Sequence, residues 1–509
     1  MDEAADFNRL QSKLRAFWPS VTLRSIGDVE RTVVVVHSIS FEVPDHLIPT
    51  FPAYEERFLC LLISLLRAPR SRVIYVTSQP ILPRIVDYFF GLVPELDTEE
   101  ARSRFHVVSL VDGTNRPLSA KLLERPGAIE RIRRMISNPE IAFLLPFSTS
   151  PFEVELAVRL GIPLYGSDPA LEYLGTKKGG RRVFADEGVP HPLGLEIGSS
   201  ADVVPAIEEI RAGRPEVAEV VVKLNRGVSG LGNALVDVAG ADGAAALGQR
   251  VAALELEDQG SSPEEYLAAL DRLGGIVEER VLGEDFRSPS VQLRISPARQ
   301  VDVLSTHDQV LGGPHGQTYF GCHFPADGEY AAQLALEGLK VGRRLAREGV
   351  IGRCAVDFVC VRSSDGWRPY ALEINLRCGG TTHPFFTLQA LTDGLYDPLS
   401  GEYRTRHGIV KHYAATDHLD DPAYSSLTPD DLLDVVSAER IGWDPDREVG
   451  VALHMVSALA VAGRIGLTAI GDTLEEARRL YYDVKRTLDG AVADNRSTES
   501  RDHRTGRRP

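Results

Sequence analysis

Cysteine, tryptophan and methionine are scarce in this 509-residue chain, which contains 5, 3 and 3 of them. No two cysteines have the C-x-x-C spacing of zinc or redox sites, so we expect reduced thiols and a cytoplasmic protein. Long apolar runs are also missing, since the longest extends from Phe58 to Leu66 and a membrane-spanning helix needs about 20 residues. The N-terminus, MDEAADFNRL, is acidic, unlike that of a signal peptide. We therefore expect neither secretion nor a membrane partner.

Positive charge is in deficit. Lysine and arginine number 56 against 72 aspartates and glutamates, which gives a formal net charge of -16. Nucleic acid binding depends on a surplus of positive charge, so we expect no nucleic acid partner. A 43% hydrophobic and 25% charged composition is that of an ordinary globular protein, and the length predicts two to four domains. Residues 495–509 lack large apolar side chains and are predicted to form a disordered tail.

The first third of the chain alternates β-branched runs with helix-length segments, which predicts βαβ units and a parallel sheet covered on both faces. No glycine fingerprint follows the first run, so a dinucleotide site has no support. The predicted strands begin near Thr32, Arg72, Phe105 and Ala142, and helices are expected over 54–67 and 129–136. Further on we expect helices over 243–273 and 330–348, and from about Gly401 a small α+β unit.

In the segment ALEINLR, Glu373, Asn375 and Arg377 alternate with two apolar residues. Residues two apart on a strand face the same side, so these three polar groups would share one face. Magnesium prefers hard oxygen ligands, which Glu373 and Asn375 supply. If SSDGW (363–367) is the loop of a hairpin, Asp357 falls opposite Glu373 and adds a carboxylate, and Arg377 can bind a phosphate or carboxylate. The alternative is a half-exposed strand whose polar residues face water.

A glycine-rich segment follows an apolar strand and lacks the Walker pattern. Glycines let backbone N–H groups approach phosphate oxygens, and a lysine at the strand end adds positive charge. The segment predicts a flap over phosphates, with a simple hairpin turn as the alternative. Its candidate residues are Lys223, Gly227, Ser229, Gly230 and Gly232.

The segment IVEERVLGEDF places acidic residues at the end of an apolar strand. It can offer backbone groups to adenine and a carboxylate to ribose. The alternative is that Glu278, Glu279 and Asp285 are solvated surface residues.

The order of these segments resembles the ATP-grasp superfamily. Lys177 precedes a helix that ends in EGVP, Lys223 precedes the flap, and residues 278–281 match the E-x-x-[LV] hinge of that family. Asp357 matches its first acidic position and residues 373–377 match E-x-N-x-R. Within the superfamily, NRGVSGLGNA, QTYFGCHFPA, EINLRCGGTTHP and HMVSALAVAGRIGLTAIGDTLEEA resemble the peptide ligases of the pheganomycin type.

The resemblance implies a multidomain fold of α/β and α+β type. It predicts a Rossmann-like pre-ATP-grasp domain (1–170), a two-lobed ATP-grasp domain (171–400) and an α+β C-terminal domain (401–494), followed by the tail (495–509).

The resemblance also implies ATP and Mg²⁺ as cofactors, with Mn²⁺ as an alternative ion. Arg377 and Lys223 are the expected catalytic residues, and Asp357, Glu373 and Asn375 the expected metal ligands. Because Lys178 directly follows Lys177, a displacement of the active lysine by one residue stays open. The nucleotide-binding residues that it implies are Lys177, Lys223, Gly227, Ser229, Gly230, Gly232, Glu278, the backbone of Glu279 and Val281, and Asp285 for the ribose.

The implied reaction is amide formation between a small carboxylic acid and the amine of an amino acid or peptide, through an acyl phosphate, with release of ADP and phosphate. Specialised peptide biosynthesis is the expected setting. The alternatives are a thioester-forming or carboxylating ATP-grasp activity and a non-catalytic nucleotide-binding module. A homo-oligomer stays open.

Three other positions lie near these motifs. His383 in GGTTHPFF either orients substrate or packs in the core. Cys378 is expected to be a buried thiol and not a nucleophile. Residues 307–309 (HDQ) either line the substrate side or form a solvated loop.

Overall fold

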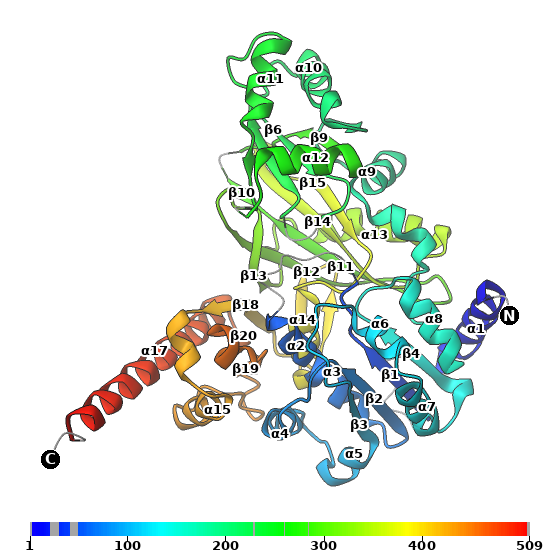
Figure 1. Ribbon diagram of the computed structural model, residues 1–509, viewed down its shortest axis with the longest axis vertical. Coiled ribbons are helices and arrows are strands. Elements are labelled where there is room, and N and C mark those ends of the chain that lie inside the picture. Colours follow the sequence, from blue (N-terminus) through cyan, green and yellow to red (C-terminus); the bar gives the residue numbers. More distant parts are fainter. Residues whose placement is uncertain are drawn as a thin grey trace.

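A computed structural model describes residues 3–20, 30–40, 49–227, 230–258, 260–283 and 285–505, with the backbone alone for Ser20 and residues 496–505. Figure 1 shows the N-terminal sheet at the lower right, a large sheet in the middle, a small helix-covered sheet at the top and the last helix at the lower left. The chain is therefore a multidomain α/β and α+β protein, as expected.

The N-terminal domain is built on a parallel sheet with strand order β3-β2-β1-β4. The central strand β1 (Arg31–Val36) is buried along its whole length, as its run of four valines predicts for a strand covered on both faces. In place of the single helix expected over 54–67, the chain forms a short α-helix, α3, between two 3-10 turns, η3 and η4. The other strands are β2 (Ser71–Thr77), β3 (Phe105–Ser109) and β4 (Ala142–Pro146). The α-helices are α1 (Glu3–Phe17), α2 (Phe51–Tyr54), α3 (Leu59–Ser64), α4 (Pro83–Leu92), α5 (Thr98–Arg104), α6 (Leu118–Leu123), α7 (Pro126–Met135) and α8 (Pro151–Leu160), and the 3-10 turns are η1 (Trp18–Ser20), η3 (Glu55–Phe58), η4 (Leu65–Arg67) and η5 (Pro139–Ile141).

The small lobe of the middle region is a five-stranded antiparallel sheet with order β5-β9-β6-β7-β8. The prediction of one continuous helical stretch over 243–273 is wrong, because strand β8 (Glu255–Leu256) divides this stretch into two helices. Ser262 and Glu265 form a capping box that starts a new helix there. The lobe contains β5 (Gly194–Ile197), β6 (Glu219–Leu224), β7 (Asn233–Asp237), β9 (Gly275–Glu279), α10 (Val203–Gly213), α11 (Ala244–Ala252) and α12 (Pro263–Leu273), with η6 (Pro169–Gly175), α9 (Lys177–Asp186) and η7 (Ser200–Asp202) nearby in sequence.

The large lobe contributes to a nine-stranded sheet with order β10-β14-β11-β12-β13-β18-β20-β19, and β15 pairs with β14. One face is packed against α13, whose buried residues recur at helical spacing. The elements of this lobe are β10 (Phe286–Arg287), β11 (Pro289–Ile295), β12 (Val301–Gly312), β13 (Thr318–Phe324), α13 (Ala331–Glu348), β14 (Gly352–Ser363), β15 (Gly366–Asn375), α14 (Thr382–Thr392), β16 (Leu395–Asp397) and β17 (Glu402–Arg404).

The C-terminal section is an α+β unit, but its strands extend the large sheet instead of forming a sheet of their own. The segment expected to form a disordered tail from residue 495 begins within α17, whose backbone is helical as far as Thr505, and residues 506–509 lie outside the described residues. A helix whose first turns are packed can propagate without further burial, since each added residue gains a backbone hydrogen bond. The elements are β18 (His412–Asp420), η8 (Pro422–Ser426), α15 (Pro429–Ala438), β19 (Gly450–His454), α16 (Ala458–Ala462), β20 (Arg464–Gly471) and α17 (Leu474–Thr505).

One apolar core joins the N-terminal domain to the C-terminal section. Phe58 from η3, Phe386 from α14 and Leu467 from β20 belong to the same buried cluster. A separate core fills the small lobe, between its sheet and helices α10 to α12. The first part of the chain is therefore packed against the C-terminal end of the large sheet, and the small lobe lies at the opposite end of the molecule (Figure 1).

Candidate functional site

A cavity of about 770 Å³ lies between the small and large lobes. Nine of the residues selected from the sequence line it: Lys223, Gly230, Glu278, Glu279, Val281, Asp357, Glu373, Asn375 and Arg377. These residues come from four strands and three loops, so the fold brings together what the sequence separates. A cavity of this size is typical of small-molecule sites.

The centre of the cavity floor is the hairpin of β14 and β15. Asp357 and Glu373 are direct cross-strand partners, as the hairpin prediction requires, and the register shifts immediately after this pair. Such bulges re-aim side chains next to active sites. Asn375 Nδ2 donates to Asp357 Oδ2 at 2.8 Å, and Gln309 Nε2 donates to Asp357 Oδ1 at 2.9 Å.

The two carboxylates form a donor set that fits a divalent cation. Burial raises the pKa of Asp357 to about 6, and the negative charge of Glu373 adds to this effect. A cation between them would remove that repulsion. Because carboxylate and amide oxygens are the ligands that Mg²⁺ prefers, Asp357, Glu373 and Asn375 fit the predicted ion.

Of the two consecutive lysines, only the first points toward the hairpin. Lys177 is buried and its Nζ lies 2.6 Å from Glu373 Oε2. Lys178 Nζ lies instead beside Gly274, near the end of β5. Their helix, α9, begins at the cap residue Thr176. This geometry favours Lys177 as the site lysine, although it is not one of the residues that line the cavity.

Lys223 lies on β6 and forms a buried ion pair with Glu278 of β9. Arg181 Nη1 lies 3.7 Å from the same carboxylate, at its Oε2. Because Glu278 is paired with both cations, it is positioned to orient Lys223 and is not a solvated surface residue. Lys223 thus reaches the cavity from the small lobe, across from the acidic hairpin.

The expected adenine hinge follows β9. Glu279 uses its backbone N–H to bind the Leu193 carbonyl at 2.8 Å, and Arg214 Nη1 lies 2.6 Å from its Oε2. The backbone group that Glu279 can offer to a base is therefore its carbonyl. Asp285 pairs with Arg287 at 2.5 Å and is not among the residues that line the cavity. The expected contact of Asp285 with a ribose therefore stays a prediction.

The glycine-rich segment joins the antiparallel strands β6 and β7. Gly230 has φ 78°, and a Cβ there would lie 2.5 Å from the Gln317 carbonyl oxygen, so this close approach requires glycine. Gly227 and Gly232 approach each other across the loop, since a Cβ on Gly227 would lie 3.3 Å from the Cα of Gly232, and neither lines the cavity. Ser229 lies outside the described residues. The segment is thus the loop of a hairpin, as one interpretation requires. It also reaches the cavity at Gly230, as the flap interpretation requires.

Arg377 is partly buried and follows β15 by two residues, and its Nη1 donates to the Cys378 carbonyl at 2.9 Å. Burial lowers the pKa of its guanidinium, while Glu373 and Asp357 act in the opposite direction. Cys378 is 8% exposed, and burial raises the pKa of its thiol. It is therefore the buried thiol expected from the sequence.

The segment at residues 307–309 belongs to strand β12 and is not a loop. His307 Nε2 lies 2.6 Å from the Tyr413 hydroxyl in the core, and Tyr330 donates to Asp308 at 2.6 Å. Only Gln309 of the three lines the cavity.

The sequence did not reveal one wall of the cavity, which comes from the two ends of the chain. Arg57 of η3 and Asp417 of β18 line it, and they form a buried ion pair of 2.8 Å. These two residues are 360 positions apart, so no local spacing connects them. The other residues of this wall are Ile39, Phe51, Tyr54, Phe147, His418 and Arg464.

Comparisons with known proteins agree with this geometry. The family model described as IQCH-like, ATP-grasp matches residues 245–379, and the model described as PGM1 C-terminal domain matches residues 431–484. The L-propargylglycine–L-glutamate ligase of Streptantibioticus cattleyicolor is 31% identical over 461 residues, which cover 88% of this chain and 92% of that protein. The chain belongs to the ATP-grasp ligases. IQ motif-containing protein H of Danio rerio is 24% identical over 74% of this chain, and the match covers 39% of that longer protein.

Solved ATP-grasp enzymes share the fold. Biotin carboxylase from Campylobacter jejuni aligns with a TM-score of 0.54 at 12% identity, over 92% of this chain and 95% of that one. The N5-carboxyaminoimidazole synthase of Aspergillus clavatus aligns with a TM-score of 0.51 at 13% identity, over 91% and 100% of the chains. At these identities the likeness shows the fold of the ATP-grasp ligase and not its substrates. Among the described residues, no helix is both long and apolar enough to span a bilayer.

Proposed function

We propose that this protein is an ATP-dependent ligase that joins an amino-acid-like carboxylate to the amine of an amino acid or peptide. The observation that carries the proposal is the convergence of Lys223, Asp357, Glu373, Asn375 and Arg377 on one cavity between two lobes. The related ligase named for propargylglycine and glutamate supports amino-acid substrates on both sides of the new bond. ADP complexes of structurally similar enzymes support the nucleotide.

The chemical problem is that a carboxylate is a poor acyl donor. Transfer of the γ-phosphoryl group of ATP converts it to an acyl phosphate, which an amine can attack with loss of phosphate. The transfer spreads negative charge over the phosphoryl oxygens, so preorganised cations lower its barrier. We assign this role to Lys177, Lys223 and Arg377.

Asp357, Glu373 and Asn375 would hold Mg²⁺, with Mn²⁺ as an alternative. When bound, the ion polarises phosphoryl oxygens and neutralises part of their charge. Gln309 and Asn375 keep Asp357 oriented through the two hydrogen bonds to its carboxylate. The loop that carries Gly230 can exclude water from the acyl phosphate, which would otherwise hydrolyse.

The test is a mass-spectrometric screen of the purified protein with ATP, Mg²⁺, mixed amino acids and short peptides. We expect a product whose mass equals donor plus acceptor minus water, formed only with ATP. Products that need a thiol such as CoA would indicate a thioester-forming enzyme, and incorporation of bicarbonate would indicate a carboxylase. Nucleotide binding without turnover of any pair would support the non-catalytic module.

A further inference from the structure

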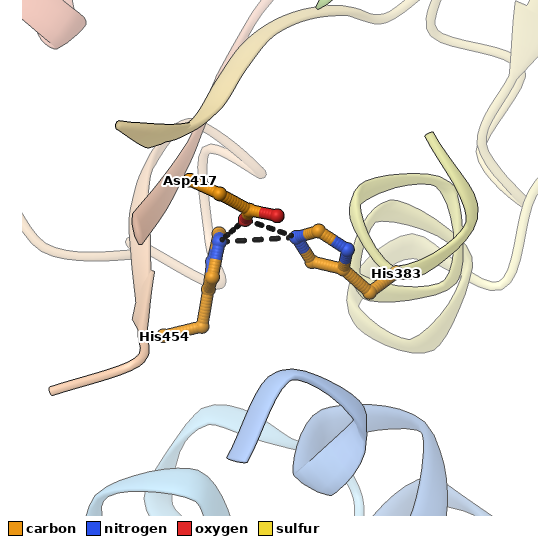
Figure 2. Close-up of side chains that lie close together, drawn as sticks. All are labelled: His383, Asp417 and His454. Atoms are coloured by element: carbon orange, nitrogen blue, oxygen red, sulfur yellow. Dashed lines mark hydrogen bonds and ion pairs between the residues drawn. The ribbon is translucent and has the colours of Figure 1, made fainter. Parts of the chain in front are cut away.

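A second cluster of ligating side chains lies beside the cavity. His383, Asp417 and His454 converge in the interior, as Figure 2 shows. The Nε2 atoms of the two histidines are 3.0 Å apart, and Asp417 Oδ1 lies 2.8 Å from His454 Nε2 and 3.1 Å from His383 Nε2. All three side chains are at most 5% exposed. Three potential ligand atoms thus form a nearly equilateral triangle out of contact with bulk water.

The three contacts of this triangle cannot all be hydrogen bonds at once, because the two Nε2 atoms supply at most two protons. The carboxylate oxygen only accepts, so both histidines must donate to it through Nε2–H to form two bonds. The two N–H groups would then converge on one oxygen, with the nitrogens only 3.0 Å apart. If one histidine does not donate, its lone pair faces the carboxylate oxygen instead. His383 Nδ1, on the far side of the ring, is buried and has no hydrogen-bond partner in the described part of the chain.

The backbone is shaped around this cluster. Asp417 lies in a β-bulge of β18, where the register with β20 shifts between Thr416 and Leu419, and bulges re-aim side chains. His454 is the cross-strand partner of Gly466 on β20. A Cβ at position 466 would lie 2.1 Å from His454 Nε2, so the imidazole occupies the place of a missing side chain.

We propose that His383, Asp417 and His454 bind a divalent transition-metal ion, separate from the magnesium site of the acidic hairpin. Three ligands at about 2.1 Å and right angles to one another have their atoms about 3.0 Å apart, as a two-histidine, one-carboxylate face requires. The observed separations of 2.8, 3.0 and 3.1 Å match this arrangement. Two imidazoles favour Zn²⁺, Fe²⁺ or Co²⁺ over Mg²⁺.

The surroundings indicate what else such an ion would bind. Arg57 Nη1 donates to the second carboxylate oxygen of Asp417 at 2.8 Å and so fixes the carboxylate. With a divalent ion bound, the ion and Arg57 together carry more positive charge than Asp417 can neutralise. Asp417 also lines the large cavity, as do Arg377 and Gly380. An anionic or amine ligand from the cavity would therefore complete the coordination. If the proposed ligase function holds, the acceptor amino acid supplies both groups, and coordination lowers the pKa of its amine.

The test is equilibrium dialysis of the full-length protein against Zn²⁺ or Co²⁺, without nucleotide or substrates, so its outcome does not depend on ligase activity. The measurements use an Asp357→Asn background, which weakens binding at the acidic hairpin. We expect one equivalent of metal, with visible absorption bands for Co²⁺. His383→Ala and His454→Ala should each weaken binding at least about 10- to 100-fold, the loss that even second-shell changes cause.

Two further variants keep the test decisive if a histidine deletion unfolds the protein. Gly466→Ala keeps every ligand but displaces the His454 ring, so it should also weaken metal binding. His418→Ala is the matched control, because His418 is the neighbour of Asp417 in the same bulge and should leave metal binding unchanged. Equal metal content in the parent Asp357→Asn protein and in its His383→Ala and Gly466→Ala derivatives would overturn the proposal. Absence of metal binding by the parent protein would also overturn it and would assign the cluster to a hydrogen-bonded structural role.

Discussion

Asp357 on β14 and Glu373 on β15 face each other across one hairpin, and Nζ of Lys177, from helix α9, lies 2.6 Å from the Glu373 carboxylate. When all three groups are ionised, the two carboxylates and the single lysine carry one excess negative charge. Burial raises the pKa of Asp357 to about 6, and the negative charge of Glu373 adds to this effect, while Arg377 and Lys177 act against it. The pair is thus prepared for an additional cation.

Removing the oxygen ligands should abolish turnover. We expect Glu373→Ala and Asn375→Ala to lower the rate by about 10² to 10³, the usual cost of deleting one electrostatic donor at such a site. Arg368→Ala, on the exposed part of the same strand, is the control and should be near wild type. Steady-state rates at saturating Mg²⁺ measure the effect. Near-normal activity of either ligand variant would show that the ion binds elsewhere.

Magnesium binding should depend on pH. Because the pKa of Asp357 is raised to about 6, a proton competes with the ion below that pH and not above it. We expect the apparent Mg²⁺ affinity to be constant from pH 7 to 8 and to fall about tenfold per pH unit well below pH 6. Magnesium titrations of activity at several pH values, with Asp357→Asn for comparison, measure it. A flat profile down to pH 5 would contradict the raised pKa.

The two consecutive lysines should differ. Lys177→Met removes the cation that contacts Glu373 and should lower the rate by about 10² to 10³. Lys178→Met removes a side chain directed toward Gly274 and should change the rate by only about twofold, as surface changes usually do. The reverse order would show that the active lysine is displaced by one residue.

Arg377 should not tolerate a conservative change. Its planar guanidinium can bind two oxygens of a phosphate or carboxylate at once, and a lysine cannot copy that geometry. We therefore expect Arg377→Lys to lower kcat/KM by at least about tenfold although the charge is kept. Arg362→Lys, at an exposed position of β14, is the matched control. Equal losses in both variants would indicate a general effect on folding.

The products should be ADP and phosphate. This follows from transfer of the γ-phosphoryl group to the carboxylate, and chromatography of the nucleotides after turnover measures it. Stoichiometric AMP and pyrophosphate would instead indicate adenylation of the donor.

The sequence predicted the acidic hairpin because its information is local. Side chains alternate with a period of two, and a short polar turn joins the strands, so the pairing of Asp357 with Glu373 was expected from spacing. The turn is tighter than the predicted loop over 363–367, since Ser363 pairs with Gly366, and the bulge between Asp357 and Phe358 restores the expected pair. The helix start at Ser262 also has a local signal, the capping box with Glu265. The alanine-rich composition around it favoured one continuous helix over 243–273, so this start was missed. The ribose role of Asp285 stays a prediction, and the ion pair of its carboxylate with Arg287, two residues away, could not be expected from the family motif.

The histidine cluster could not be predicted in this way. Its ligands come from α14, β18 and β19, and Arg57 comes from the opposite end of the chain. In the sequence His454 is a lone polar residue among apolar neighbours, which is typical of satisfied core residues. The other three lie in the mixed segments YEERF, TTHPF and ATDHL, so no local spacing marks them as a set. Only the packing of three distant segments brings them together.

The large sheet continues across the predicted domain boundary at residue 400, which has a consequence for shortened forms of the protein. Strand β18 pairs with β13 over Gly321–Phe324 and covers its outer edge. A shortened protein that stopped before β18 would leave that edge without its partner and would uncover the apolar side chains packed on it. Bare strand edges of this kind recruit other chains. The last hundred residues therefore act as an integral part of the catalytic lobe, and the shortened protein should self-associate.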